Sequence, residues 1–161
     1  MSAWTVVKKD VQVEAKPAGL WTLVLEWIDG PAFLKLEAGS EEWHYSESEN
    51  GKCGADGHLG SLLAAKTCLL PSAPVGALIG KVGGSSAGSS DGTLFVVGKF
   101  TLVEIDKPKG PLYLTINDEL TGFANNRSSI TVTVSSRPSA ASPPPPLGRA
   151  TGGTTGAAGT T

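Results

Sequence analysis

The sequence predicts an all-β protein: a small antiparallel β-sandwich of jelly-roll type, followed by a disordered tail. Apolar and polar residues alternate with a period of two through residues 1–134. The alternating runs are rich in β-branched and aromatic residues, and each is bounded by Gly, Pro, Asn or Asp. No segment has a convincing helical period, and residues 59–66 have room for one or two helical turns at most.

The expected strands follow one another along the chain. In the first clear run, one face carries Trp21, Leu23, Leu25 and Trp27. Asp29-Gly30-Pro31 forms a turn in which Gly30 supplies the permissive backbone angle. The segment 76–84 reads as a strand where glycines allow close backbone approach. Further strands are expected at 33–38, 100–105, 112–116 and 130–134.

The composition changes after Val134 and divides the chain. Residues 1–134 are expected to form the sandwich domain. Residues 135–161 are rich in Pro, Gly, Ser and Thr and contain no aromatic or acidic residue. Such a segment cannot bury enough apolar surface to offset its ordering entropy, so we expect a disordered tail or a linker.

Composition also argues against several functions. The formal net charge of −2 disfavours a dedicated nucleic-acid binder. No apolar run approaches the ~20 residues that cross a bilayer, so membrane insertion is not expected. No signal peptide is visible, which leaves a cytoplasmic location or release by a non-standard route. No pattern of nucleophile or paired carboxylates indicates an enzyme, so no catalytic residue is assigned.

The loop between the last two expected strands, residues 117–129, concentrates oxygen donors. It contains Asp118, Asn125 and Asn126. Ca²⁺ takes about six to eight oxygen ligands, and one carboxylate with two carboxamides can supply about three of them. With a single negative ligand the ion keeps positive charge and open positions, which suits a neutral polyol. The alternative is that these residues simply make turns.

A second polar segment, residues 43–60, carries two histidines and a cysteine. The spacing of His44, Cys53, His58 and Cys68 matches no zinc pattern. His58 is consistent with an ordinary exposed histidine in a loop. Cys53 and Cys68 are expected either to form a disulfide or to remain thiols, depending on the redox compartment.

Four segments together resemble the bacterial PA-I galactophilic lectin family. They are GALIGKVG at 76–83, GPLYLTIND at 110–118, the Asn125-Asn126 pair and the strand at 130–134. The resemblance covers roughly residues 30–134 and implies a β-sandwich that binds terminal galactose through Ca²⁺. The sugar's hydroxyls would coordinate the ion directly.

Carried over by position, the resemblance assigns roles to individual residues. The metal ligands would be the side chains of Asp118, Asn125 and Asn126 and the carbonyls of Gly122 and Tyr45. The sugar would contact Asp118, Asn125, Glu119 and Tyr45, with His58 at its 6-hydroxyl.

We therefore expect a calcium-dependent lectin domain that is not an enzyme and whose partners are galactose-containing glycans. Affinity at one site should be modest, so several copies are needed, through a homo-oligomer or through tethering by the tail. Two alternatives remain at this point. One is a structural or interaction module whose metal loop only stabilises the fold, and the other is an ancillary carbohydrate-binding domain of a larger enzyme.

Overall fold

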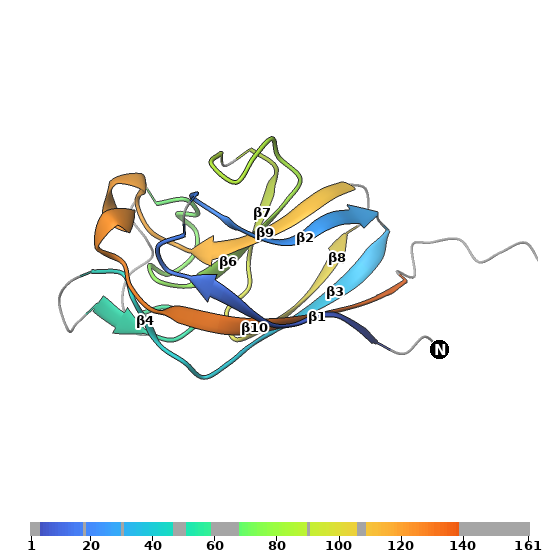
Figure 1. Ribbon diagram of the computed structural model, residues 1–161, viewed down its shortest axis with the longest axis horizontal. Coiled ribbons are helices and arrows are strands. Elements are labelled where there is room, and N and C mark those ends of the chain that lie inside the picture. Colours follow the sequence, from blue (N-terminus) through green and yellow to red (C-terminus); the bar gives the residue numbers. More distant parts are fainter. Residues whose placement is uncertain are drawn as a thin grey trace, which may run out of the picture.

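Two antiparallel four-stranded sheets face each other in the computed structural model of the protein (Figure 1). The structure describes residues 4–17, 19–29, 31–46, 51–58, 68–89, 91–105 and 109–138. The first sheet has the order β1 (Thr5–Glu14), β10 (Ser129–Pro138), β3 (Ala32–Ala38) and β8 (Phe100–Ile105). The second has the order β2 (Thr22–Asp29), β9 (Lys109–Ile116), β6 (Leu78–Val82) and β7 (Thr93–Val96).

A short pair of strands and a 3-10 helix also lie outside these sheets. The strands β4 (Trp43–His44) and β5 (Lys52–Cys53) pair with each other. A 3-10 helix, η2 (Leu120–Asn125), lies in the connection from β9 to β10. None of the helical residues that the structure describes forms a helix long and apolar enough to cross a membrane.

The core lies between the two sheets and is built from alternate residues of their strands. These side chains are at most 1% exposed: Leu34, Leu36, Leu78, Leu112, Leu114, Ile116, Ile130, Val132 and Val134. Burying one face of each strand is what the period of two in the sequence requires. The predicted all-β antiparallel sandwich is confirmed.

The expected alternation along β2 is wrong. Leu23, Leu25 and Trp27 were placed on one face, but Leu23 is 49% exposed and Trp27 is 63% exposed, whereas Val24 and Ile28 are buried. The register of β2 on β9 shifts between Leu23 and Leu25 and again between Leu25 and Ile28. Each irregularity moves the following side chains to the other face of the sheet, which no alternating pattern anticipates.

Strand β10 also extends further than the sequence suggested. It continues to Pro138, with Ser135 paired to Lys35 and Arg137 paired to Phe33. Ser135 is buried, and the Arg137 guanidinium lies 5.2 Å from the centre of the Phe33 ring. The predicted boundary after Val134 therefore falls inside a strand, because a polar composition does not prevent backbone pairing at a sheet position.

Other expectations concern residues that the structure does not describe. They are the remainder of the predicted tail, residues 139–161, the helical turns at 59–66, and Gly30 of the predicted turn.

The glycine-containing strand is confirmed as β6. Gly80 pairs with Phe95 of β7, and a Cβ at Gly80 would come within 2.5 Å of the Phe95 ring. Only glycine leaves room for that ring, so the group that approaches Gly80 is a side chain and not the backbone that the sequence indicated.

A buried lysine anchors a loop to the outer face of the second sheet. Lys81 is 0% exposed and lies between two aromatic rings, with its Nζ 5.1 Å from the centre of Trp21 and 4.5 Å from that of Tyr113. Its ammonium donates hydrogen bonds to the carbonyls of Ser86, at 2.9 Å, and Ser89. Burial lowers the pKa of Lys81. The charge is retained because the carbonyls and rings replace its hydration.

Lys81→Met should lower the free energy of unfolding by about 1–3 kcal/mol, because two loop carbonyls lose their charged donor. Chemical denaturation at neutral pH measures this difference. Lys99→Met, at an exposed lysine before β8, is the matched control and should leave stability nearly unchanged. Equal stabilities for the Lys81 variant and the wild type would contradict the role of the ammonium.

Candidate functional site

The β9–β10 connection and the β4–β5 hairpin lie at the same end of the sandwich (Figure 1). His44 and Arg127 join them by exchanging two backbone hydrogen bonds, of 2.9 and 3.1 Å. Segments about eighty positions apart in the sequence thus form one surface. The predicted metal loop and the predicted histidine segment are both part of it.

Asn117, which directly follows β9, fixes the geometry of this end. Its side chain is 0% exposed. Its Oδ1 accepts from the Leu70 amide at 2.9 Å, and its Nδ2 donates to the carbonyls of Leu70, Ala73 and Pro74 at 2.9, 3.3 and 3.1 Å. Asn117 was not among the residues predicted for the site, and its one signal is an Asn that directly follows the predicted strand 112–116.

Asp118 is held next to this anchor and is only 6% exposed. Its Oδ1 accepts from the Glu119 amide at 2.7 Å, while its Oδ2 is buried without a well-formed hydrogen bond from any described residue. Burial raises the pKa of Asp118, and the Glu119 amide and the nearby Asn126 side chain offset this only partly. A buried carboxylate oxygen without a hydrogen-bond donor lowers the stability of the folded state, so its presence requires an explanation.

Asn126 carries a second buried oxygen of the same kind. The residue is 4% exposed, and its Nδ2 donates to the Ala15 carbonyl at 3.1 Å. That bond fixes which end of the amide is nitrogen, so Oδ1 is the atom left buried without a partner among the described residues. Two acceptors that lack donors thus lie in one short loop.

A hard cation would satisfy both atoms. Ca²⁺ prefers carboxylate and amide oxygens, which is the donor set that Asp118 and Asn126 provide. The described ranges hold no cluster of three or more His, Cys, Asp or Glu that could hold a metal ion. Among the described residues, amide and carbonyl oxygens would be the donors that complete such a coordination, and this donor chemistry fits calcium.

The two aromatic residues predicted for the site contact each other. The Tyr45 Oη and the His58 Nδ1 are 2.7 Å apart, and their rings meet edge to face with centres 6.0 Å apart. Burial, followed by the charges of Cys53 and Asp118, raises the pKa of Tyr45, so its phenol is protonated at neutral pH. The influence of Asp118 also shows that this pair lies within electrostatic reach of the carboxylate.

Gly76 supports the tyrosine from behind. Its φ is +85°, and a Cβ there would come within 2.5 Å of the Cys53 Sγ and 2.9 Å of the Tyr45 ring. Its carbonyl accepts from the Trp43 indole at 2.8 Å. Only glycine combines this backbone angle with such close packing, so the position of Tyr45 depends on it.

The remaining predicted residues lie around this centre. Asn125, the last residue of η2, has an exposed side chain, and Gly122 lies within the same 3-10 helix. Glu119 forms an isolated backbone bridge with Cys68. The structure thus brings Asp118, Asn126, Tyr45 and His58 together, while the side chain of Asn125 lies at the surface.

Neither Cys53 nor Cys68 forms a disulfide, and both are buried. Burial raises the pKa of the Cys53 thiol to about 11. Cys53 is therefore a protonated, weakly reactive thiol at neutral pH.

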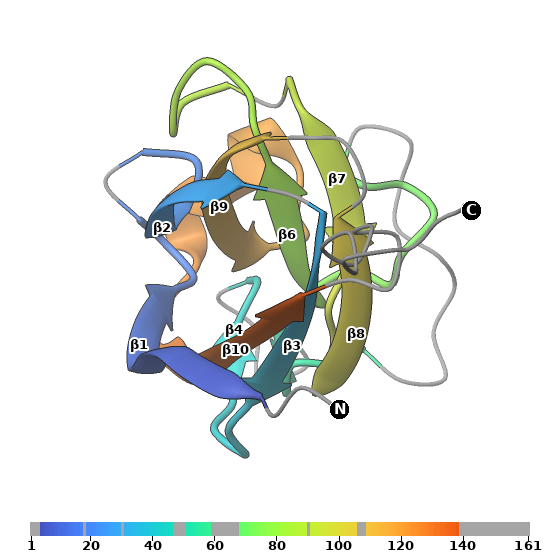
Figure 2. The same cartoon turned by 90° about the vertical axis from the view of Figure 1, so that its right-hand side faces the viewer.

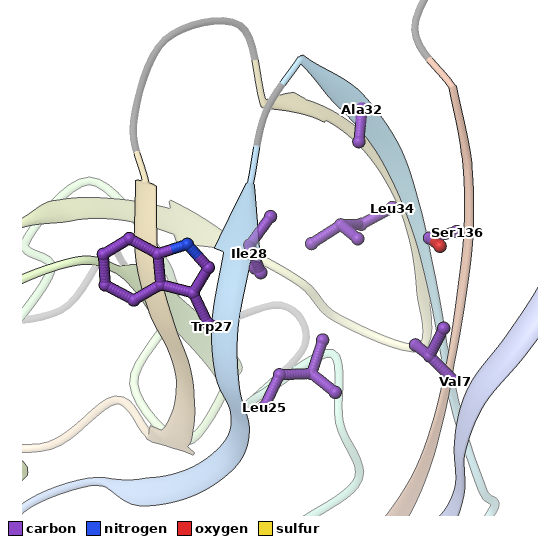
Figure 3. A pocket seen from close by; sticks show the side chains of 7 residues that line it. All are labelled: Val7, Leu25, Trp27, Ile28, Ala32, Leu34 and Ser136. Carbon is purple, nitrogen blue, oxygen red and sulfur yellow. The ribbon is translucent and has the colours of Figure 1, made fainter.

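An apolar pocket of about 200 Å³ lies elsewhere, at the opposite end of β10 (Figure 3). Its lining residues are Val7, Leu25, Trp27, Ile28, Ala32, Leu34 and Ser136. With a single polar lining residue, it offers few partners to a hydroxyl-rich ligand. The candidate site is therefore the polar end and not this pocket.

The fold of this chain is shared with known structures. Eight chains of solved structures match it. Among them is the N-terminal domain of EclA, described as a PllA-like lectin, with a TM-score of 0.58 and 17% identity over 83% of this chain and 98% of that domain. No protein-family model and no curated protein matches the sequence. The likeness concerns the β-sandwich architecture, and the resemblance to the PA-I family stays a prediction.

Asp118→Asn should stabilise the calcium-free protein at neutral pH, by about 1 kcal/mol. Because the pKa of Asp118 is raised in the folded state, the native protein binds its proton more tightly than the unfolded chain, and stability is lost as pH rises above the ordinary value of 3.8. An amide removes this cost, and the advantage should fade below that pH. Thermal denaturation in chelator across pH measures the effect.

Asp91→Asn is the control, and its expected effect on stability at neutral pH has the opposite sign. Hydrogen bonds from the Ser89 hydroxyl and the Ser85 amide lower the pKa of Asp91 to about 2, so its stabilising contribution is present at neutral pH and is lost as pH falls toward that value. This variant should be less stable than the wild type at neutral pH. A calcium-free Asp118→Asn protein that is destabilised at neutral pH would contradict the account of the buried carboxylate.

Proposed function

We propose that the protein binds carbohydrate through a calcium ion, with terminal galactose as the sugar. The observation that carries this proposal is the pair of buried oxygens without donors, Asp118 Oδ2 and Asn126 Oδ1. The lectin fold and the resemblance of residues 30–134 to galactose-binding lectins support it. The structural neighbour is itself described as a lectin, a class of sugar-binding proteins.

Each residue at this end has a role in the proposal. The side chains of Asp118 and Asn126 hold the ion, and the exposed Asn125 side chain and the carbonyls of Gly122 and Tyr45 are the further ligands. The bound ion supplies a charge that vicinal sugar hydroxyls can coordinate in exchange for water. Because the only charged ligand is Asp118, the ion keeps positive charge for a neutral sugar.

The tyrosine and histidine form the second wall of the proposed site. The Tyr45 phenol and the His58 Nδ1 lie 2.7 Å apart, at hydrogen-bonding distance, so the phenol holds the imidazole in one orientation at this wall. His58 also lines a polar depression of about 250 Å³ with Glu42, Lys52, Cys53, Gly54 and Gly57. Glu42 and Lys52 form an ion pair there, at 3.4 Å. A sugar hydroxyl at this wall meets a polar, hydrogen-bonding surface.

We propose binding without catalysis at this site. Glycoside hydrolysis generally needs two carboxyl groups that flank the scissile bond. In the described part of the site, Asp118 is the one buried carboxylate, and it is assigned to the ion.

Isothermal titration of galactose should give heat in the presence of calcium and none after excess chelator. Asp118→Asn should abolish calcium and galactose binding together, because the single charged ligand is lost. Glu104→Gln, at an exposed carboxylate on β8, should bind like the wild type. Equal heats with and without chelator would contradict the metal-dependent mechanism. A calcium-induced rise in melting temperature with no galactose heat would favour a purely structural metal loop.

Tyr45→Phe should weaken galactose binding about 2- to 10-fold, because one hydrogen bond that orients His58 is lost, while calcium affinity stays unchanged. The chain has two tyrosines, so Tyr113→Phe, in the Lys81 cluster, is the matched control. Calorimetry with each ligand separates the two effects. A Tyr45→Phe protein with wild-type galactose affinity would remove the proposed role of the phenol.

A further inference from the structure

One side of the sandwich exposes a band of large apolar side chains. Figure 2 shows β1 and β2 on this side, where each is the outer strand of its sheet. The exposed fractions on these strands are 56% for Val6, 40% for Val7, 49% for Leu23 and 63% for Trp27. Exposed apolar side chains that gather on one side of a domain mark an interaction site more often than isolated ones do.

The band contains both a projecting side chain and a hole. The apolar pocket of about 200 Å³ opens between β1, β2 and β3, with Leu25, Ile28 and Leu34 in its wall (Figure 3). The Trp27 indole stands at the rim and points away from Leu25 and Ile28 (Figure 3). The two register shifts of β2 contribute to this arrangement, because they place Leu25 against the core between Leu23 and Trp27, which are both exposed.

Opposite charges lie beside the projecting tryptophan. A neighbouring groove of about 510 Å³ is lined by Lys8, Leu23, Val24, Leu25, Glu26 and Trp27. No ion pair between Lys8 and Glu26 is found among the described residues. A cation, an anion, a projecting side chain and a pocket on one surface are the parts from which a twofold, self-complementary interface is built.

A second copy of the chain fits this surface better than a sugar does. The pocket has one polar lining residue, Ser136, so sugar hydroxyls would lose their water without replacement. A second copy supplies an indole to fill the pocket and a charge of the right sign for both Lys8 and Glu26. Tryptophan is also a residue type that commonly dominates interface energies.

We propose that this side forms a symmetric dimer. The Trp27 indole of each copy enters the apolar pocket of the other, and Lys8 of each copy faces the partner's Glu26. The inference is independent of the carbohydrate proposal. The sugar-binding end lies away from this pocket along β10, so a dimer presents two sites at once.

Sedimentation velocity of the full chain, from micromolar to millimolar concentration, should show a monomer–dimer equilibrium. Trp27→Ser should weaken the dimer at least about 30-fold, because a central aromatic anchor is lost. Its high exposure in the single chain means that folding is retained, which an unchanged melting temperature at low concentration verifies. Phe100→Ser, at a 55% exposed aromatic on β8 of the other side, should leave the dimer intact.

Charge reversal tests the pairing directly. Lys8→Glu alone and Glu26→Lys alone should each weaken self-association, because like charges then meet twice across the axis. An equimolar mixture of the two variants should dimerise again, since both contacts then join opposite charges. The proposal is overturned by a wild type that is monomeric throughout, by an unaffected Trp27→Ser protein, or by a mixture that fails to associate.

Discussion

The side chain of Asn117 is the interaction on which the candidate site depends. Its amide bonds with the backbone of residues 70, 73 and 74 and fixes that segment to the end of β9. The backbone of the same residue accepts from Gly76 and donates to Ala77, both at 2.8 Å. Gly76 packs against the Tyr45 ring, so the bonds of Asn117 to this segment also fix the tyrosine. Asp118 is fixed because it is the next residue in the chain. A single satisfied buried amide thus sets the positions of both walls of the site.

The contrast between Asn117 and its neighbours supports the placement of the proposed ligand site. All the polar atoms of the Asn117 side chain are satisfied by the fold, so it contributes rigidity. Asp118 and Asn126 are also buried, yet each keeps one oxygen to which no described residue donates. A fold selected only for stability would pair or expose such atoms, since each costs about 1–3 kcal/mol when left alone. Their presence on a rigid support is the expected form of a preorganised ligand site.

Much of this architecture could be predicted from the sequence, because a strand with one buried face must alternate. The strands around Leu34, Leu114 and Val132 follow that rule, and Asp118 and Asn126 lie in one loop as their spacing suggested. The facing of the β2 side chains could not be predicted, because one register shift turns Leu25 to the core face and a second restores the outward facing of Trp27, with no signal in the composition. The contact between Tyr45 and His58 was equally inaccessible, since it depends on how Gly76 and Cys53 pack behind the ring.

The irregularity of β2 has a physical use that regular alternation would not provide. A regular strand would have turned its apolar residues toward the core and left a polar outer edge, which protects edge strands from association. Here the shifts place Leu25 against the core while Leu23 and Trp27 stay exposed, and the pocket beside Trp27 remains incompletely filled. A sugar bound mainly through hydroxyls gains little affinity from one site, because each hydroxyl is well solvated in water. Two sites on one rigid body gain affinity through effective concentration, without any change to the contacts at either site.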